Sequence, residues 1–358
     1  MGTVSELRLP ADREHILVAK RAAGAFGSLA GFDMDDVDDL TIAVAQACEN
    51  AIRCLEQSGS IAGQVRIVFK MSDTGLEVNV RSSVNLDAEL RAAGLRMADF
   101  LASLSRSGQP PKAAVVAGVA VGLHSSIGEL LDEVERYVGE GYLRVKLKIT
   151  PGWDDEPLGE VRRRWPELVL FADANGTYAD EAPAEAAARL ALLDRHGLAC
   201  IEQPLGDADL AGHRELARQL RTPLCLDEAL TSVASVIAAL DMGACSVVNV
   251  KAGRFGGYLE AVRVHDLCAD RGVPVWCGGM VETGIGRAAN VALASLPNFT
   301  LPGDLSASGR FFEQDLAGPL EIAPGGTISV PEGPGTGVTV SPEALRAFAS
   351  WRRWYPAS

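Results

Sequence analysis

The sequence lacks long hydrophobic runs and any excess of positive charge. None of its 358 residues belongs to a run of about 18 uncharged apolar residues, the length that spans a bilayer. The 47 Asp and Glu outnumber the 33 Lys and Arg, which gives a formal net charge of −14. Nucleic acids and anionic membranes bind clustered positive charge, so the composition argues against both as partners. The binding partner that we expect is therefore a small molecule or a protein.

Paired cysteines and a secretory leader are also missing. The seven cysteines are odd in number and form no Cys-x-x-Cys pair, so we expect buried, reduced thiols rather than disulfides or a zinc site. The sequence begins MGTVSELRLPADREH, with acidic side chains and no apolar block behind a basic one, unlike a secretory signal. We therefore expect a cytoplasmic protein.

From about residue 115 the sequence alternates between short apolar runs and amphipathic stretches. This alternation is typical of strands and helices that build a parallel sheet. Two helix-like stretches end at Gly197 and Gly272, where we expect left-handed C-caps. The apolar runs cover residues 115–123, 143–149, 168–175, 199–204, 223–228, 245–251, 274–279 and 299–304.

Eight such runs favour a closed (β/α) barrel of the TIM type. An open, doubly wound sheet is the alternative, but it normally carries a glycine-rich phosphate-binding turn after an early strand, and the sequence shows none. We predict an α/β fold with the barrel over residues 115–304. Catalytic side chains of such barrels project from the C-terminal ends of the strands.

Five ionisable residues stand at or near the ends of five successive apolar runs. By subtraction of residue numbers they are 25, 29, 25 and 24 positions apart, close to one strand–helix unit each, so one ring of side chains would face one cavity. A single acid at a strand end can simply cap the next helix, but five in consecutive units are harder to explain in that way. The residues are Lys148, Asp173, Glu202, Asp227 and Lys251.

The residue types in this ring indicate which cofactor it can bind and which reaction it can catalyse. Three carboxylates without histidine or cysteine are hard oxygen ligands, which suits Mg²⁺ or Mn²⁺. Lys146 and Lys148 are two apart on one strand, so both face the barrel interior, where a nearby cation shifts lysine toward the neutral amine of a general base. Such a ring suits the removal of a proton next to a substrate carboxylate, through an enediolate. Racemisation, epimerisation and elimination all remain open.

Several segments resemble the enolase superfamily, in its muconate-lactonising subgroup: VKLKI, DANGTY, IEQPL, CLDEAL, VNVKAGRFGGYLEA and WCGGMVETGIGRAAN. The match is to the family of o-succinylbenzoate synthases and N-succinylamino acid racemases, from about residue 86 to the end. This resemblance implies that Lys148 and Lys251 are the acid/base pair and that magnesium binds Asp173, Glu202 and Asp227. The implied substrate is a small, succinyl-bearing carboxylate, and we expect a homo-oligomer. Implied substrate-binding positions are Lys146, Asn175, Gly279, Met280 and Glu282.

Two reactions and one non-enzymatic role follow from the resemblance. The leading function is dehydration to o-succinylbenzoate, a step of menaquinone biosynthesis. The first alternative is racemisation of N-succinylamino acids, or the activity of another racemase or epimerase of the superfamily. Both pass through the same enediolate. The second alternative is a regulatory, anti-sigma-type binding protein with an inactive barrel, because the segment before residue 85 does not resemble the family's N-terminal capping domain.

Residues 1–84 instead resemble a truncated anti-sigma-factor kinase of the histidine-kinase-like ATPase fold. Asn50 falls at that family's magnesium-binding asparagine, but Gln46 replaces its glutamate base, and no DxGxG nucleotide box follows Val80. The plain alternative is an amphipathic helix with Asn50 on its surface. We expect a partial α+β domain here, open to a protein partner.

The two resemblances also predict the boundaries of the remaining domains. Residues 85–104 match the last helix of the family's capping domain, so we assign 85–114 to a remnant of that helix and a linker. The barrel takes residues 115–304, and residues 305–358 form a C-terminal segment that packs on it.

Overall fold

The computed structural model describes residues 4–10, 13–32, 37, 40, 41, 44, 45, 47–49, 51, 52, 64–72, 75–82 and 86–348. The chain divides into two compact units, residues 1–94 and 95–358. Two short helices, α3 (Leu86–Ala92) and α4 (Met97–Leu104), occupy the stretch that the sequence assigns to one helix, and the division falls between them. The domain limits given above stay predictions.

The first unit contains a three-stranded antiparallel sheet. β1 (Val4–Pro10) pairs with β2 (Gln64–Ser72), which pairs with β3 (Gly75–Ser82). The 3-10 turn η1 (Arg13–His15) leads into α1 (Ile16–Leu29). Alternate side chains of β2 are buried because neighbouring residues of a strand point to opposite faces. They form one core with the buried face of α1, made of Val65, Ile67, Phe69, Ala19 and Ala23.

Helical residues between 37 and 52 complete this core. Val44, Cys48 and Ile52 recur every four positions and are buried, as on one face of an amphipathic helix. Gln46 and Asn50 lie outside the described residues. Their comparison with the ATPase family therefore stays a prediction.

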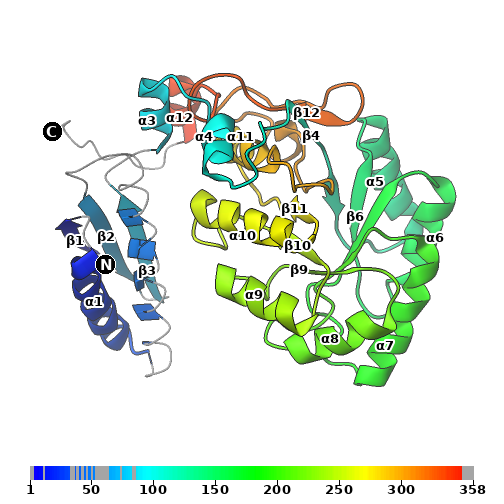
Figure 1. The fold of residues 1–358 in the computed structure, drawn as a ribbon. Helices are drawn as coiled ribbons and strands as arrows, with labels where there is room; N and C mark the ends of the chain where they lie inside the picture. Colours follow the sequence, from blue (N-terminus) through cyan, green and yellow to red (C-terminus); the bar gives the residue numbers. More distant parts are fainter. Residues whose placement is uncertain are drawn as a thin grey trace. The chain divides into compact units, whose positions relative to one another are not determined.

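The second unit is built on a curled parallel sheet of seven strands in the order β11-β10-β9-β8-β7-β6-β5. Each strand is followed along the chain by a helix, and α5 to α10 lie around the strands in Figure 1. The predicted α/β fold with a TIM-like barrel is confirmed. The strands are β5 (Val119–Val121), β6 (Arg144–Lys148), β7 (Val169–Asp173), β8 (Ile201–Glu202), β9 (Leu224–Leu226), β10 (Val247–Val250) and β11 (Val275–Cys277).

The helices of this unit have local signals that start and stop them. Ser126 caps α5 by accepting a hydrogen bond from the backbone of Glu129, and Ser232 and Ser235 form a capping box at α9. Gly197 and Gly272 have the predicted left-handed conformation, with φ of 60° and 66°. The helices are α5 (Ile127–Gly139), α6 (Asp155–Arg164), α7 (Pro183–Leu192), η2 (Leu193–His196), α8 (Leu210–Gln219), α9 (Val233–Met242), α10 (Tyr258–Asp270), α11 (Gly284–Ala294), η3 (Ser308–Arg310) and α12 (Pro342–Phe348).

Two predicted apolar runs differ from the structure. The run 115–123 divides, because β4 (Ala114–Val116) turns away to pair with β12 (Thr327–Ser329) and only β5 joins the barrel. The run 299–304 lies beside β11 but forms no named strand. Its backbone is joined to β11 by the bridge Val275–Phe299 and by a 2.9 Å hydrogen bond from Asp304 N to Cys277 O. The stretch 299–305, which we call the closing segment, fills the gap between β11 and β5.

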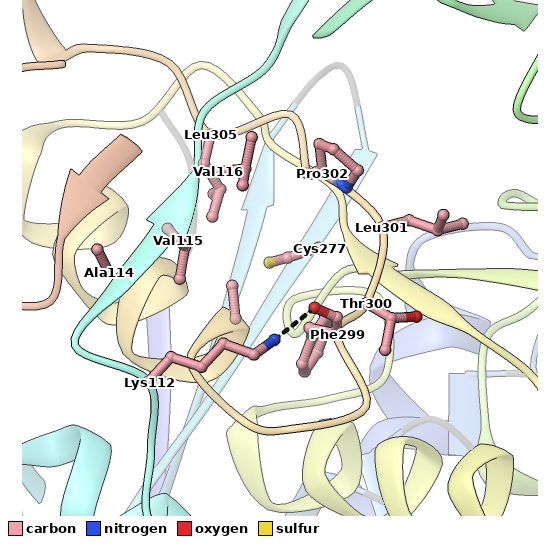
Figure 2. Close-up of a pocket in the computed structure, with 12 residues that line it drawn as sticks. Lys112, Ala114, Val115, Val116, Cys277, Phe299, Thr300, Leu301, Pro302 and Leu305 are labelled. Atoms are coloured by element: carbon pink, nitrogen blue, oxygen red, sulfur yellow. Dashed lines mark hydrogen bonds between the residues drawn. The ribbon is translucent and has the colours of Figure 1, made fainter. Parts of the chain in front are cut away.

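A small cavity lies between β4 and the closing segment (Figure 2). It has a volume of about 170 Å³, and its lining is largely apolar, with Val115, Cys277 and Leu305 among the side chains. The Lys112 amine donates a 2.7 Å hydrogen bond to Phe299 O at one side. None of the predicted site residues lines this cavity, so it is distinct from the candidate active site.

The cysteines behave as predicted where the structure describes them. Six are unpaired and buried, namely Cys48, Cys200, Cys225, Cys245, Cys268 and Cys277. Cys54 lies outside the described residues. Among the described residues, no helix is both long and apolar enough to cross a membrane.

Candidate active site

The five predicted ring residues lie at the C-terminal edge of strands β6 to β10. The register places Lys148 opposite Asp173 and Asp173 opposite Glu202 on neighbouring strands. The three carboxylate residues Asp173, Glu202 and Asp227 are 1%, 0% and 1% exposed. Burial of several charges is costly unless they are paired, so their partners decide what the site can do.

Lys146 is at the centre of the first group of charges. Its Nζ lies 2.8 Å from Asp173 Oδ2, 2.7 Å from Glu202 Oε2 and 2.8 Å from Asp304 Oδ2. Burial opposes its charge, but the three carboxylates raise the pKa of Lys146 well above its usual range. This shift reflects the carboxylates that surround the amine, and the lowering expected beside a divalent cation stays a prediction.

The pKa values of the neighbouring carboxyl groups shift in opposite directions. Burial, together with the charges of Asp173 and Asp227, raises the pKa of Glu202 to about 8 although Lys146 opposes the shift. Burial also acts against the charge of Asp173, but Lys146 and Lys148 lower the pKa of that carboxyl. Asn249 stabilises Glu202 further, with a 2.7 Å hydrogen bond from Nδ2 to Oε1.

Lys148 stands at the outer side of this group and is partly open to solvent. Its Nζ donates to Asp173 Oδ2 at 2.7 Å and also contacts Asn175 Oδ1. The Asn175 amide donates in turn to Glu228 Oε1 at 2.8 Å. Asn175 has a φ of 43°, a left-handed conformation that asparagine tolerates better than most residues. The predicted Asn175 is thus next to the acid/base candidate.

Lys251 lies on the other side of the ring, beyond Glu202. Its Nζ donates to Asp227 Oδ2 at 2.6 Å, and Arg254 NH1 lies 2.9 Å from Asp227 Oδ1. Burial raises the pKa of Asp227 despite these two cations. The two candidate acid/base lysines are therefore held by different carboxylates, with Glu202 between them.

The remaining predicted positions follow β11. A Cβ on Gly279 would lie 2.0 Å from Asp304 O, so only glycine allows this approach. Met280 is 57% exposed. Glu282 accepts a 2.6 Å hydrogen bond from Asn290 Nδ2, and burial raises the pKa of its carboxyl. Met280 and Glu282 line a cavity of about 500 Å³ that also contacts Lys251.

Sequence reasoning missed Asp304 and Arg144. Asp304 lies near the end of the closing segment and binds Lys146 on one oxygen and Arg144 on the other. Arg144 is fully buried, and its guanidinium lies over the Phe171 ring at 4.1 Å and the Trp276 ring at 5.0 Å. The available signal was the acid at the end of the eighth apolar run, in the same place as the acids of the other runs.

The residues fit a divalent cation by their chemistry. Among the described residues, no three His, Cys, Asp or Glu gather as a ready ligand group. The amines of Lys146, Lys148 and Lys251 instead lie against the carboxylates. However, the donors are hard oxygens on adjacent strands, and both burial and the charges of Asp173 and Asp227 oppose the charge of Glu202, which a bound cation would offset.

A parallel (β/α) barrel with three buried acids between two lysines is the class of protein that this structure defines. The model of the family described as enolase C-terminal domain-like matches residues 129–344. The chain is 51% identical over 287 residues to the N-succinylamino acid racemase of Amycolatopsis sp., which covers 80% of this chain and 73% of that protein. It is 45% identical over 236 residues to the o-succinylbenzoate synthase of Bacillus subtilis, which covers 66% of this chain and 62% of the synthase.

Solved structures agree. A member of the enolase superfamily from Listeria innocua has a TM-score of 0.64 and 32% identity, covering 79% of this chain and 89% of that one. The dipeptide epimerase of Cytophaga hutchinsonii, complexed with Mg and a dipeptide, has a TM-score of 0.66 over 79% of this chain and 90% of its own, but at 18% identity it supports the fold alone. The chain belongs to the enolase superfamily, in the family of o-succinylbenzoate synthases and N-succinylamino acid racemases. The predicted family, which is one of enzymes, is confirmed.

Proposed function

We propose that this chain removes a proton next to the carboxylate of a small substrate, with Mg²⁺ or Mn²⁺ as cofactor, and that its main reaction is the dehydration that forms o-succinylbenzoate. The observation that carries the proposal is the placement of Lys148 and Lys251 on opposite sides of three buried carboxylates. The known relatives named as o-succinylbenzoate synthases support the choice of reaction.

The metal would be held by Asp173, Glu202 and Asp227, whose oxygens are the ligands that Mg²⁺ prefers. When bound, it supplies positive charge next to the carboxylate of the substrate, where negative charge develops during proton removal. Glu202 would serve as a ligand in its ionised form, and Lys146 and Asn249 hold its two oxygens in place. Asp304 keeps Lys146 charged and in position.

The lysines move the protons. A neutral amine at Lys148 or Lys251 takes the proton from the α-carbon, which leaves an enediolate between them. For dehydration, the same lysine then returns its proton to the leaving hydroxyl, and the other lysine remains as a fixed positive charge beside the intermediate. For racemisation, the second lysine must deliver a proton to the opposite face.

The substrate would extend from the lysines into the cavity of about 500 Å³ beside Lys251. Asn290 and Tyr258 line it, and the Tyr258 hydroxyl donates to Asn290 Oδ1 at 3.1 Å. Four glycines also line this cavity, namely Gly253, Gly257, Gly278 and Gly286. A succinyl-bearing carboxylate is the proposed substrate class, as the names of the relatives indicate.

N-succinylamino acid racemase is the second candidate. The observation in its favour is that each lysine is held by its own carboxylate, so that either amine can exchange a proton, and a racemase of Amycolatopsis is 51% identical to this chain. A regulatory role of residues 1–84, homo-oligomeric assembly and a cytoplasmic location stay predictions.

Turnover by the purified chain tests the proposal. The protein is assayed with Mg²⁺ against the cyclohexadiene precursor of o-succinylbenzoate and against N-succinylamino acids, with α-proton exchange into D₂O as a second readout. Formation of o-succinylbenzoate supports the leading function, and exchange confined to succinylated amino acids supports the racemase. Binding of Mg²⁺ without exchange in any of these substrates would overturn both and favour the regulatory alternative.

A further inference from the structure

Gln203 directly follows Glu202 and has an unusual backbone. Its φ is 40°, a left-handed conformation that costs a residue with a side chain on the order of 1–2 kcal/mol. Asn175 is the other non-glycine residue with this property among the described residues, and it also adjoins the carboxylate ring. Gln203 is 1% exposed. Strain of this kind persists only where the surroundings fix it, and it clusters at functional sites.

The backbone of Gln203 forms hydrogen bonds with β9 on one side and with the loop after β7 on the other. Its N–H donates to Cys225 O on β9 at 2.9 Å. Its carbonyl accepts from Gly176 N at 2.7 Å, in the loop that follows Asp173 on β7. The left-handed turn directs the two polar groups to these partners, so β8 is tied on both sides just beyond Glu202.

The side chain extends the same connection to Asp227. Its Oε1 accepts from Asp227 N at 3.0 Å and from Ala229 N at 3.3 Å, and its Nε2 donates to Leu205 O at 3.0 Å. A carboxamide presents an acceptor and a donor together, whereas a carboxylate lacks the donor. Gln203 thus contacts the backbone of Asp227 itself and follows Glu202 in the chain, and it reaches the loop after Asp173.

We propose that Gln203 is a positioning residue that fixes the spacing of the three carboxylates and thereby sets the affinity of the site for its divalent cation. The inference rests on the proposed function, because it assigns these carboxylates to the metal. A residue that only stabilised the barrel would change its unfolding and leave the affinity of the folded site unaltered.

Two substitutions separate the amide from the other properties of Gln203. Gln203→Gly deletes the amide but accepts the left-handed backbone at no cost. Gln203→Met also deletes the amide but keeps most of the volume, so it avoids a cavity. Asn298→Ala is the matched control, since it removes an amide that donates to Val273 O at 2.9 Å at the N-terminal end of the barrel.

The measurement is Mn²⁺ binding, followed by the electron paramagnetic resonance signal of the free ion, with thermal unfolding in parallel. We expect both Gln203 variants to raise the Mn²⁺ Kd about 10- to 100-fold, the range for residues that orient metal ligands. Asn298→Ala should lower the melting temperature and leave the Kd unchanged. Excess Mn²⁺ should restore part of the activity of the Gln203 variants.

The outcomes are distinct from those of the proposed function. Gln203→Met tests the amide even if Gln203→Gly does not fold. The expected rise in its Mn²⁺ Kd is tenfold or more, and a Kd within about twofold of wild type overturns the inference. Wild-type protein that binds Mn²⁺ without turnover overturns the proposed reaction and leaves the inference standing on the Kd. Wild-type protein that binds no Mn²⁺ overturns both.

Discussion

Lys146 Nζ lies 2.8 Å from Asp304 Oδ2, and this contact joins β6 to the closing segment. The other oxygen of Asp304 binds Arg144, also on β6. Burial opposes the charge of Asp304, but Arg144 and Lys146 hold the pKa of its carboxyl far below the usual range. Asp304 is therefore held in its charged form and forms ion pairs with two buried cations.

Asp304→Asn should destabilise the protein strongly. Removing one partner of a buried ion pair leaves the others uncompensated, which costs about 3–5 kcal/mol. Urea unfolding measures this loss. Asp270→Asn is the control, because its pair with Arg106 is exposed, with 63% of each side chain accessible, and exposed pairs contribute little. Equal losses in the two variants would show that Asp304 has no special place in the barrel.

Asp227→Asn should weaken the binding of Mg²⁺ and Mn²⁺ strongly. One of three anionic ligands loses its charge, while the side chain keeps its shape and one oxygen donor. Titration calorimetry of the purified chain checks this. Asp241→Asn serves as the control, since Asp241 is exposed and pairs with Arg271. An unchanged affinity in Asp227→Asn would remove this residue from the site.

Substitution of Lys148 and of Lys251 should affect dehydration and racemisation differently. Lys148→Ala should abolish dehydration and racemisation. Lys251→Ala should abolish racemisation and slow dehydration by the loss of a fixed positive charge, worth roughly a few kcal/mol. Solvent deuterium exchange gives the readout, because each variant should exchange the α-proton of only the enantiomer that faces its remaining lysine. Exchange of both enantiomers by either variant would contradict the assignment of one lysine to each face.

The environment of Asp266 predicts how the free energy of unfolding depends on pH. Burial opposes its charge, but the Arg106 backbone N–H at 2.8 Å, the Ser105 hydroxyl at 2.6 Å and His265 lower the pKa of its carboxyl. A carboxyl with a lowered folded pKa stabilises the protein above its unfolded pKa of about 3.9 and loses this contribution as the pH falls through the folded value.

Urea unfolding of wild type and Asp266→Asn from pH 7 to pH 2.5 tests this. The difference between the two free energies of unfolding should be constant above about pH 5 and shrink as the pH falls below 4. Ser105→Ala removes one of the three donors and should show the same trend with a smaller amplitude. A difference that does not vary with pH would contradict the role of the Asp266 charge.

Sequence alone predicted much of the barrel and of the ring, for a physical reason. Strand ends of a parallel sheet meet at one edge, so Lys148, Asp173 and Glu202 could be placed together from their spacing alone. The roles of Asp304 and Gln203 could not be predicted in this way. Their contacts, Asp304 to Lys146 and Gln203 to Asp227 N, depend on side-chain direction and on one left-handed backbone turn, which periodicity does not reveal.

Apolar composition misled the sequence analysis at the run 299–304, which was predicted to be a strand. The run 299–304 is as apolar as its neighbours, yet it makes an irregular connection, because Gly303 passes so close to β11 that a Cβ there would lie 2.5 Å from Cys277 O. Apolar composition predicts that a segment is buried. It does not predict that the segment forms a regular ladder on both sides.

The closing segment gives the barrel a seam. Among the described residues, one backbone hydrogen bond, from Gly118 N to Leu305 O at 3.3 Å, joins this segment to the residues that lead into β5. The ion pairs of Asp304 with Arg144 and Lys146 span the same gap. Amide hydrogen exchange should therefore begin along this line, at a free energy below that of global unfolding. The barrel is closed there by ion pairs more than by backbone hydrogen bonds. Asp304, which forms these ion pairs, is also linked through Lys146 to the carboxylates of the site.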